Sequence, residues 1–101
     1  MTIKWVKSDP LVMNGEPFCY GTRLTVRNIL EMRSHGLAPG EMMAQHPELK
    51  RVGIAEAYQF AREHRERYAA FLEPDGSLRG PGFEPDERAA LPEHLREAAG
   101  P

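Results

Sequence analysis

Residues 15–26, GEPFCYGTRLTV, join an extended segment to the start of a helix. Their order decides how this chain folds. Residues 18–20 (FCY) are typical of a strand, and Gly21 supplies a bend that most other residues resist. Thr25 can cap a helix by accepting a hydrogen bond from a free backbone N–H of the first turn. The stretch therefore predicts a strand, a turn and a helix N-terminus in succession.

Upstream of this joint, the two apolar runs 11–13 and 18–20 flank Asn14-Gly15. An Asn-Gly pair between apolar runs indicates a hairpin, because both residues tolerate positive φ. Residues 3–7 add a third candidate strand, and Pro17 argues for an edge position since it has no N–H to give to a ladder. We expect a small N-terminal hairpin with a third strand.

Three helices are predicted after the joint. The first runs from Val26 to His35 and is closed by Gly36, and the second is short and begins at Pro39. The third runs from about Arg51 to Leu72. Its apolar residues gather on one arc of the helix: Ile54, Ala57, Tyr58, Phe60, Ala61, Tyr68, Phe71 and Leu72. His64 lies within this arc as an expected core histidine, while Glu56, Glu63 and Arg67 are expected on the other face, with Glu63 and Arg67 spaced as a supportive pair.

The composition changes after residue 72. Residues 73–101 hold five of the nine prolines and four of the nine glycines, and they carry three basic against seven acidic side chains, a net charge of −4. We expect a helix-turn-helix-like domain at 1–72 and a partly disordered acidic tail at 73–101, with a short helix near 92–99. The fold class is α+β, mainly α: an N-terminal hairpin followed by a three-helix, winged-helix-like unit.

Size, charge and cysteine count narrow the function. The 101 residues form about one domain, and a domain this small is often completed by a second copy, so a homodimer is expected. No apolar run is long enough for a signal peptide or a membrane span, which predicts a cytoplasmic protein. Cys19 is the single cysteine, which excludes an internal disulfide and a multi-cysteine zinc site. Residues 1–37 carry five basic against three acidic side chains, so the net charge of −2 comes from the tail.

Several short motifs follow one another with fixed spacing. They are Asp9-Pro10-Leu11, Asn14-Gly15-Glu16-Pro17, Gly21-Thr22-Arg23-Leu24-Thr25-Val26, Gly36-Leu37 and His46-Pro47-Glu48-Leu49. Together they resemble the signatures of the "domain of unknown function 433" family, over roughly residues 3–65. The resemblance implies a helix-turn-helix-like fold and, for many members, the antitoxin role in a toxin–antitoxin pair. The implied partners are a PIN-like ribonuclease toxin and the protein's own promoter DNA, bound as a dimer.

The chain departs from the family pattern at two helix starts. Ala38 to Glu41 replace a serine cap and paired acids, and Lys50 to Gly53 replace a threonine and an acidic pair. Two capping side chains are thus missing, each worth about 1 kcal/mol.

For DNA binding, the candidates lie mainly on the third helix. Lys50 and Arg51 at its N-terminus, with Arg62 and Arg65 along one flank, are placed to meet phosphates, and Gln59 to reach a base edge. The alternative is a solvated charged face. Arg23 is expected either to pin the hairpin to a carbonyl or carboxylate, or to reach a phosphate.

For toxin binding, the candidates lie in the tail. Its apolar residues Phe83, Leu91 and Leu95 are expected to order against a toxin groove, and its arginines Arg79 and Arg88 to enter an acidic metal site there. A merely solubilising tail is the alternative.

Catalysis is not expected. Cys19 lies in a predicted strand without a nearby base and is better explained as a small packed hydrophobe. His35, His46 and His94 lack metal-ligand spacing, so no metal or cofactor is expected. The sequence thus favours an antitoxin and autorepressor, with a stand-alone DNA-binding regulator or a pure protein-interaction module as alternatives.

Overall fold

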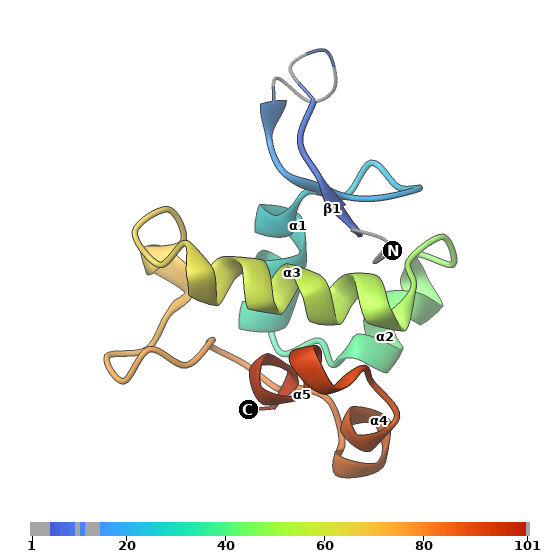
Figure 1. The fold of residues 1–101 in the computed structure, drawn as a ribbon, viewed down its shortest axis with the longest axis vertical. Coiled ribbons are helices and arrows are strands. Elements are labelled where there is room, and N and C mark those ends of the chain that lie inside the picture. Colours follow the sequence, from blue (N-terminus) through green and yellow to red (C-terminus); the bar gives the residue numbers. More distant parts are fainter. Residues whose placement is uncertain (1–4, 10, 12–14, 101) are drawn as a thin grey trace.

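The computed structural model describes residues 5–9, 11 and 15–100, and its fold is α+β and mainly α, as the sequence predicts (Figure 1). In chain order the elements are β1 (Val6–Lys7), β2 (Phe18–Cys19), α1 (Val26–Ser34), α2 (Pro39–Gln45), α3 (Arg51–Glu63), a 3₁₀ turn (Ala69–Phe71), α4 (Pro85–Ala89) and α5 (Glu93–Ala99).

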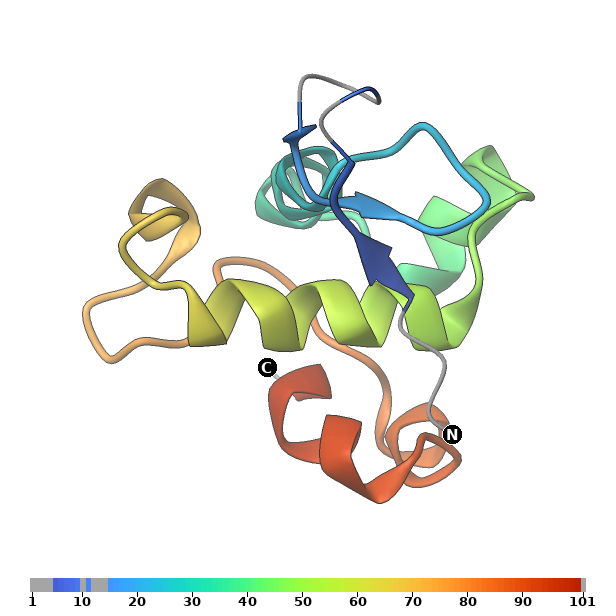
Figure 2. The same ribbon diagram turned by 45° about the horizontal axis from the view of Figure 1, so that its top comes forward.

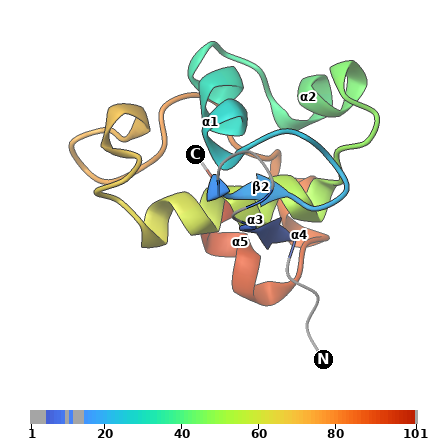
Figure 3. The same ribbon diagram turned by 90° about the horizontal axis from the view of Figure 1, so that it is seen from above.

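Helix α3 crosses the centre of the molecule and contacts β1, β2, α1, α2 and α5. In Figure 1 the hairpin lies above α3, α1 and α2 lie behind it, and α4 and α5 lie below it. Figure 2 shows the same order of layers, and seen from above in Figure 3, β2 crosses over α3 with α1 and α2 to one side. The third predicted helix is therefore the core of the fold.

The N-terminal hairpin pairs β1 with β2 in antiparallel register, with Val6 opposite Cys19 and Lys7 opposite Phe18. The Tyr20 N–H extends the ladder by donating to the Trp5 carbonyl at 2.7 Å. The described sheet thus joins the first and last of the three expected strands. The middle strand and its turn fall largely on residues 12–14, which lie outside the described residues.

The joint between β2 and α1 forms as predicted. Gly21 has φ of 82°, and the Thr22 hydroxyl donates to the Cys19 carbonyl at 2.8 Å. The Thr25 hydroxyl accepts the Asn28 N–H at 3.0 Å, and the Asn28 side-chain oxygen accepts the Thr25 N–H at 3.0 Å. These reciprocal bonds satisfy two backbone donors that a helix start would otherwise leave free.

The ends of α1 and α2 also follow the sequence. Gly36, with φ of 94°, donates to the Arg33 carbonyl at 2.9 Å and closes α1 one residue earlier than predicted. Helix α2 begins at Pro39 without a side-chain cap, as the missing serine implies. The Glu41 carboxylate partly compensates, because it accepts the Ala38 N–H at 3.0 Å.

The predicted length of the third helix, residues 51–72, is wrong. Helix α3 ends at Glu63, and the chain turns back through the next five residues. Residues 62–67 are all charged or histidine, so a continued helix would have nothing to bury there. The turn instead returns Tyr68 to the core, fully buried and edge-on to Phe60 at 6.1 Å between ring centroids.

Two side-chain predictions that depended on the longer helix are also wrong. His64 is exposed rather than in the core; it stacks on Phe60 at 4.0 Å between centroids. Arg67 does not pair with Glu63 but lies 3.4 Å from the Glu16 carboxylate, because the turn carries it towards the hairpin.

The tail predicted to be partly disordered is packed against the rest of the chain. Phe83, Leu91 and Leu95 are each at most 3% exposed, and α5 lies along α3. The radius of gyration of 12.5 Å is that of a compact domain of this length, about 13 Å. The apolar residues of this proline- and glycine-rich segment are thus part of the chain's own core.

Arg33 of α1 holds the C-terminal segment in place through hydrogen bonds made in the core. Its side chain is fully buried, and Nη2 donates to the carbonyls of Leu78 and Gly100, each at 3.4 Å. The guanidinium lies 4.5 Å from the centre of the Tyr58 ring, a cation–π contact. Burial lowers the pKa of Arg33 and raises the pKa of Tyr58 to about 12.

The close packing of the C-terminal segment on α1 predicts different outcomes for two glycine substitutions. Both Gly80 and Gly36 have positive φ, 102° and 94°, but an added Cβ at Gly80 would lie 1.9 Å from the Arg33 carbonyl oxygen, whereas at Gly36 it would meet nothing within 4 Å. Gly36→Ala should lower the free energy of unfolding by about 1 kcal/mol from backbone strain. Gly80→Ala should lower it by about 3 kcal/mol or more, since the steric clash adds to the strain. Urea unfolding measures both values, and an equal or smaller effect at Gly80 would contradict the packed segment.

Candidate nucleic-acid interface

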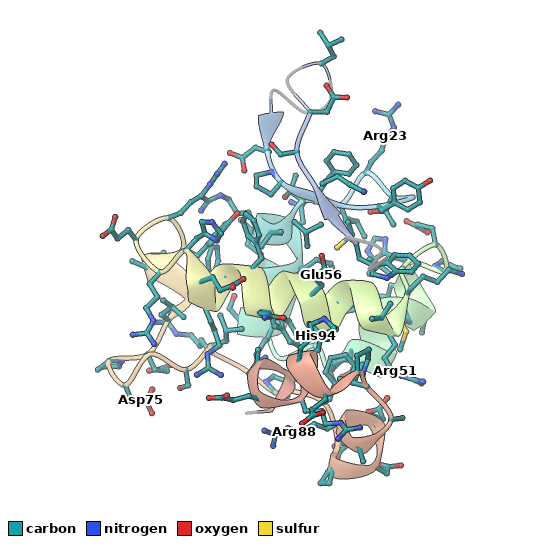
Figure 4. The ribbon with its side chains drawn as sticks, viewed as in Figure 1. Arg23, Arg51, Glu56, Asp75, Arg88 and His94 are labelled. Carbon is teal, nitrogen blue, oxygen red and sulfur yellow. The ribbon has the colours of Figure 1, made fainter. Side chains whose placement is uncertain are left out.

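Glu56 on α3 holds the hairpin in place. One carboxylate oxygen, Oε1, accepts the backbone N–H groups of Trp5 at 2.9 Å and Val6 at 3.1 Å. Both donors belong to the start of β1, whose edge would otherwise leave them unpaired. The expectation that Glu56 faces away from the core is therefore wrong, and its position in Figure 4, on the hairpin side of α3, agrees with these bonds.

Aromatic and basic side chains gather on the hairpin. The Trp5 and Tyr20 rings meet edge to face at 6.2 Å, and the Lys7 ammonium lies 5.6 Å from the centre of the Tyr20 ring. Arg23 follows in the turn after Tyr20; it is exposed and points outward from the hairpin in Figure 4. Among the described residues, the Arg23 guanidinium has no hydrogen bond or ion pair, so the expected pin to a carbonyl or carboxylate is not observed there.

The N-terminus of α3 lies next to the hairpin. The Trp5 Cβ lies 4.0 Å from where a Cβ at Gly53 would stand. Lys50, the N-cap residue, and Arg51, the first helical residue, are both exposed, and neither supplies a side-chain cap to the first turn. Arg51 reaches towards α4, where its Nε lies 3.7 Å from the Glu87 carboxylate.

We group the accessible residues of both segments as the candidate interface and call them the hairpin–α3 surface; Arg23 lies on the hairpin, and Arg51 lies at the start of α3 on the side of α4 (Figure 4). Its members are Trp5, Lys7, Tyr20, Arg23, Lys50 and Arg51. Four of the six are cations, and they come from segments more than 25 residues apart in the sequence.

The other predicted DNA-binding residues lie elsewhere. Gln59, Arg62 and Arg65 line a pocket of about 230 Å³ together with His94 of α5. Arg62 donates to the Glu97 carbonyl at 3.3 Å, so it helps to hold α5 on α3. The structure thus brings Lys50 and Arg51 together and leaves these three residues at the opposite end of α3, under the C-terminal segment.

The predicted partner-binding residues are largely occupied within the chain. Phe83, Leu91 and Leu95 are core residues, so they offer no exposed apolar face to a partner. Arg88 folds back to donate to the carbonyls of Arg96 and Glu97. The last of the set, Arg79, is exposed and pairs with Glu73 at 3.2 Å.

Cys19 behaves as the packed hydrophobe that the sequence predicts. It is 2% exposed, and burial, followed by the nearby charge of Glu56, raises the pKa of its thiol to about 12. A thiol that is almost entirely protonated at neutral pH is a poor nucleophile. Within the described ranges, no three His, Cys, Asp or Glu side chains come together as a possible metal site.

Trp5, Lys7 and Tyr20 belong to the surface, although the sequence alone does not single them out. Their signal is present as aromatics close to basic residues in KWVK and FCYGTR, but the antiparallel register that places Trp5 beside Tyr20 cannot be read from it. Glu56 is missed because a carboxylate at that position of an amphipathic helix normally faces solvent.

Comparison with known proteins identifies a family. A family model described as "Protein of unknown function (DUF433)" matches residues 6–61. Neither the curated proteins nor the solved structures include a match. In the described part of the chain, no helix is long and apolar enough to span a bilayer.

Proposed function

The chain belongs to the DUF433 family, and on that premise we propose that it is the antitoxin and autorepressor of a type II toxin–antitoxin pair. In this proposal it binds DNA of its own promoter as a homodimer, and it neutralises a PIN-like ribonuclease toxin. The antitoxin role rests on the family resemblance, and the DNA-binding role rests on the hairpin–α3 surface.

The single observation that supports DNA binding is the grouping of Lys7, Arg23, Lys50 and Arg51 on that surface. Exposed cations from two rigid elements can meet phosphates on either side of a groove. The first turn of α3 adds backbone N–H groups that no side chain caps, and such groups at a helix N-terminus favour anions.

The surface also indicates how DNA would be contacted. Helix α3 is covered by the hairpin, by α1 and by α5, and its accessible side chains include the half-buried acid Glu56 and the exposed acid Glu63. DNA would therefore meet the N-terminal end of α3 and the hairpin, rather than the length of α3. This is a wing-and-helix arrangement in which the hairpin contributes as much as the helix.

The two alternative functions differ in how they use the hairpin–α3 surface. A stand-alone DNA-binding regulator would use it without a toxin. A pure protein-interaction module would not use it for DNA. Since the apolar residues of the C-terminal segment are buried, a toxin would have to contact other residues than Phe83, Leu91 and Leu95.

Salt dependence tests the DNA-binding role. We expect the double variant Lys50→Ala/Arg51→Ala to bind a duplex from the region upstream of its own coding sequence more weakly. The slope of log K against log salt concentration should fall by about 0.9 for each phosphate that the variant no longer neutralises, thus by about 2 in total. Arg62→Ala/Arg65→Ala is the matched control, because it removes the same charge from the C-terminal end of α3 and the turn after it and should change the slope little. An equal effect of both variants, or no binding by the wild type, would contradict the proposal.

Co-expression tests the antitoxin role. The product of the adjacent gene should inhibit growth when expressed alone, and co-expression of this chain should relieve the inhibition and yield a stable complex. DNA binding without relief and without a complex would instead support a stand-alone regulator.

A further inference from the structure

Tyr20 presents an unusually open aromatic ring. It is 56% exposed and, with Leu11 at 94%, it is one of the two large exposed apolar side chains among the described residues. The two residues of β2 that precede it are less exposed: Phe18 is half-buried and Cys19 is buried. An exposed aromatic ring offers a flat face on which a nucleobase can stack.

The Tyr20 ring is held rather than loose. Trp5 packs edge to face against it, and the Tyr20 N–H is bonded to the Trp5 carbonyl. The Trp5 N–H is in turn fixed to Glu56 on α3 at 2.9 Å. Hydrogen bonds thus link Tyr20 through Trp5 to Glu56 of the central helix. Little side-chain entropy would be lost when a ligand stacks on the ring.

Cations frame the ring. The Lys7 ammonium lies over one face of the ring, 5.6 Å from its centre, and Arg23 follows Tyr20 by three residues in the turn. The two acids of the hairpin interact with other groups than Lys7 and Arg23: Glu16 is paired with Arg67, and Asp9 accepts the Leu11 N–H at 2.9 Å. An exposed aromatic ring with positive charges on the same hairpin is complementary to a nucleobase attached to its phosphates.

We infer that Tyr20, Trp5, Lys7 and Arg23 form a stacking platform for an unpaired base of single-stranded DNA. In a duplex the base faces are stacked on one another, so an exposed ring can stack only on a base that is unpaired or at an end. The assignment to DNA rests on the proposed function, because the platform lies on the hairpin that packs against α3, whose N-terminus carries Lys50 and Arg51. The platform itself goes beyond that function, since phosphate contacts alone require no aromatic ring.

A 12-nucleotide oligo(dT) is the probe, and the fluorescence of Trp5, the chain's single tryptophan, reports its binding. We expect the wild-type protein to show quenching on titration, because a base stacked on Tyr20 lies close to the indole. Tyr20→Ala should bind oligo(dT) about tenfold or more weakly, since stacking on one aromatic ring accounts for a factor of this order. Tyr20→Phe, which keeps the ring, should stay within about threefold of the wild type.

Leu11→Ala is the matched control, because it removes an exposed apolar side chain from the same hairpin without removing a ring. It should leave the affinity within about threefold. Equal affinity of Tyr20→Ala and the wild type, or no binding of oligo(dT), would overturn the platform. Tighter binding of oligo(U) than of oligo(dT) would overturn its assignment to DNA.

The two proposals fail in different ways. If the promoter duplex binds through Lys50 and Arg51 while oligo(dT) does not bind, the platform is wrong and the proposed function stands. If oligo(dT) binds through Tyr20 while the promoter duplex does not bind, the proposed function is wrong and the platform stands.

Discussion

The carboxylate of Glu56 is the contact on which the candidate interface depends. It receives two backbone N–H groups from the start of β1, so a side chain of the central helix completes the edge of the sheet. Hydrogen bonds to a charged acceptor contribute about 1.5 to 3 kcal/mol. Without them, the hairpin, a two-stranded ribbon that is marginally stable by itself, would be held to α3 by its apolar contacts alone. Glu56 thus fixes where Tyr20 and Arg23 stand relative to the first turn of α3.

The opposite side of α3 is closed by the C-terminal segment. Arg33 reaches through the core to two carbonyls of that segment, and α5 covers the flank of α3 that carries Arg62. A buried guanidinium without a carboxylate partner is costly unless carbonyls and an aromatic face stabilise it, and both are present here. The result is a helix enclosed on most sides, with its N-terminal end left open.

Local signals in the sequence predict the individual helices and turns, but not which elements pack against one another. The helix cap at Thr25, the turn at Gly21 and the start of α2 at Pro39 depend on neighbours within a few residues, and all three are confirmed. The end of α3 and the packing of residues 73–100 depend on contacts across the fold, which periodicity does not contain. For the same reason Lys50, Arg51 and Arg23 can be proposed as contacts from the sequence, whereas their combination with Trp5 and Tyr20 requires the hairpin register.

The affinity of Glu56→Ala for the promoter duplex tests this account most directly, measured under conditions where circular dichroism shows the variant folded. Removing an acid near a DNA-binding surface should strengthen binding on electrostatic grounds alone. The account predicts weaker binding, because the hairpin would no longer be held against α3. Glu63→Ala, which removes the same charge from an exposed position on α3, should bind as well as the wild type or better. Equal or tighter binding by Glu56→Ala would contradict the claim that hairpin and helix act as one surface.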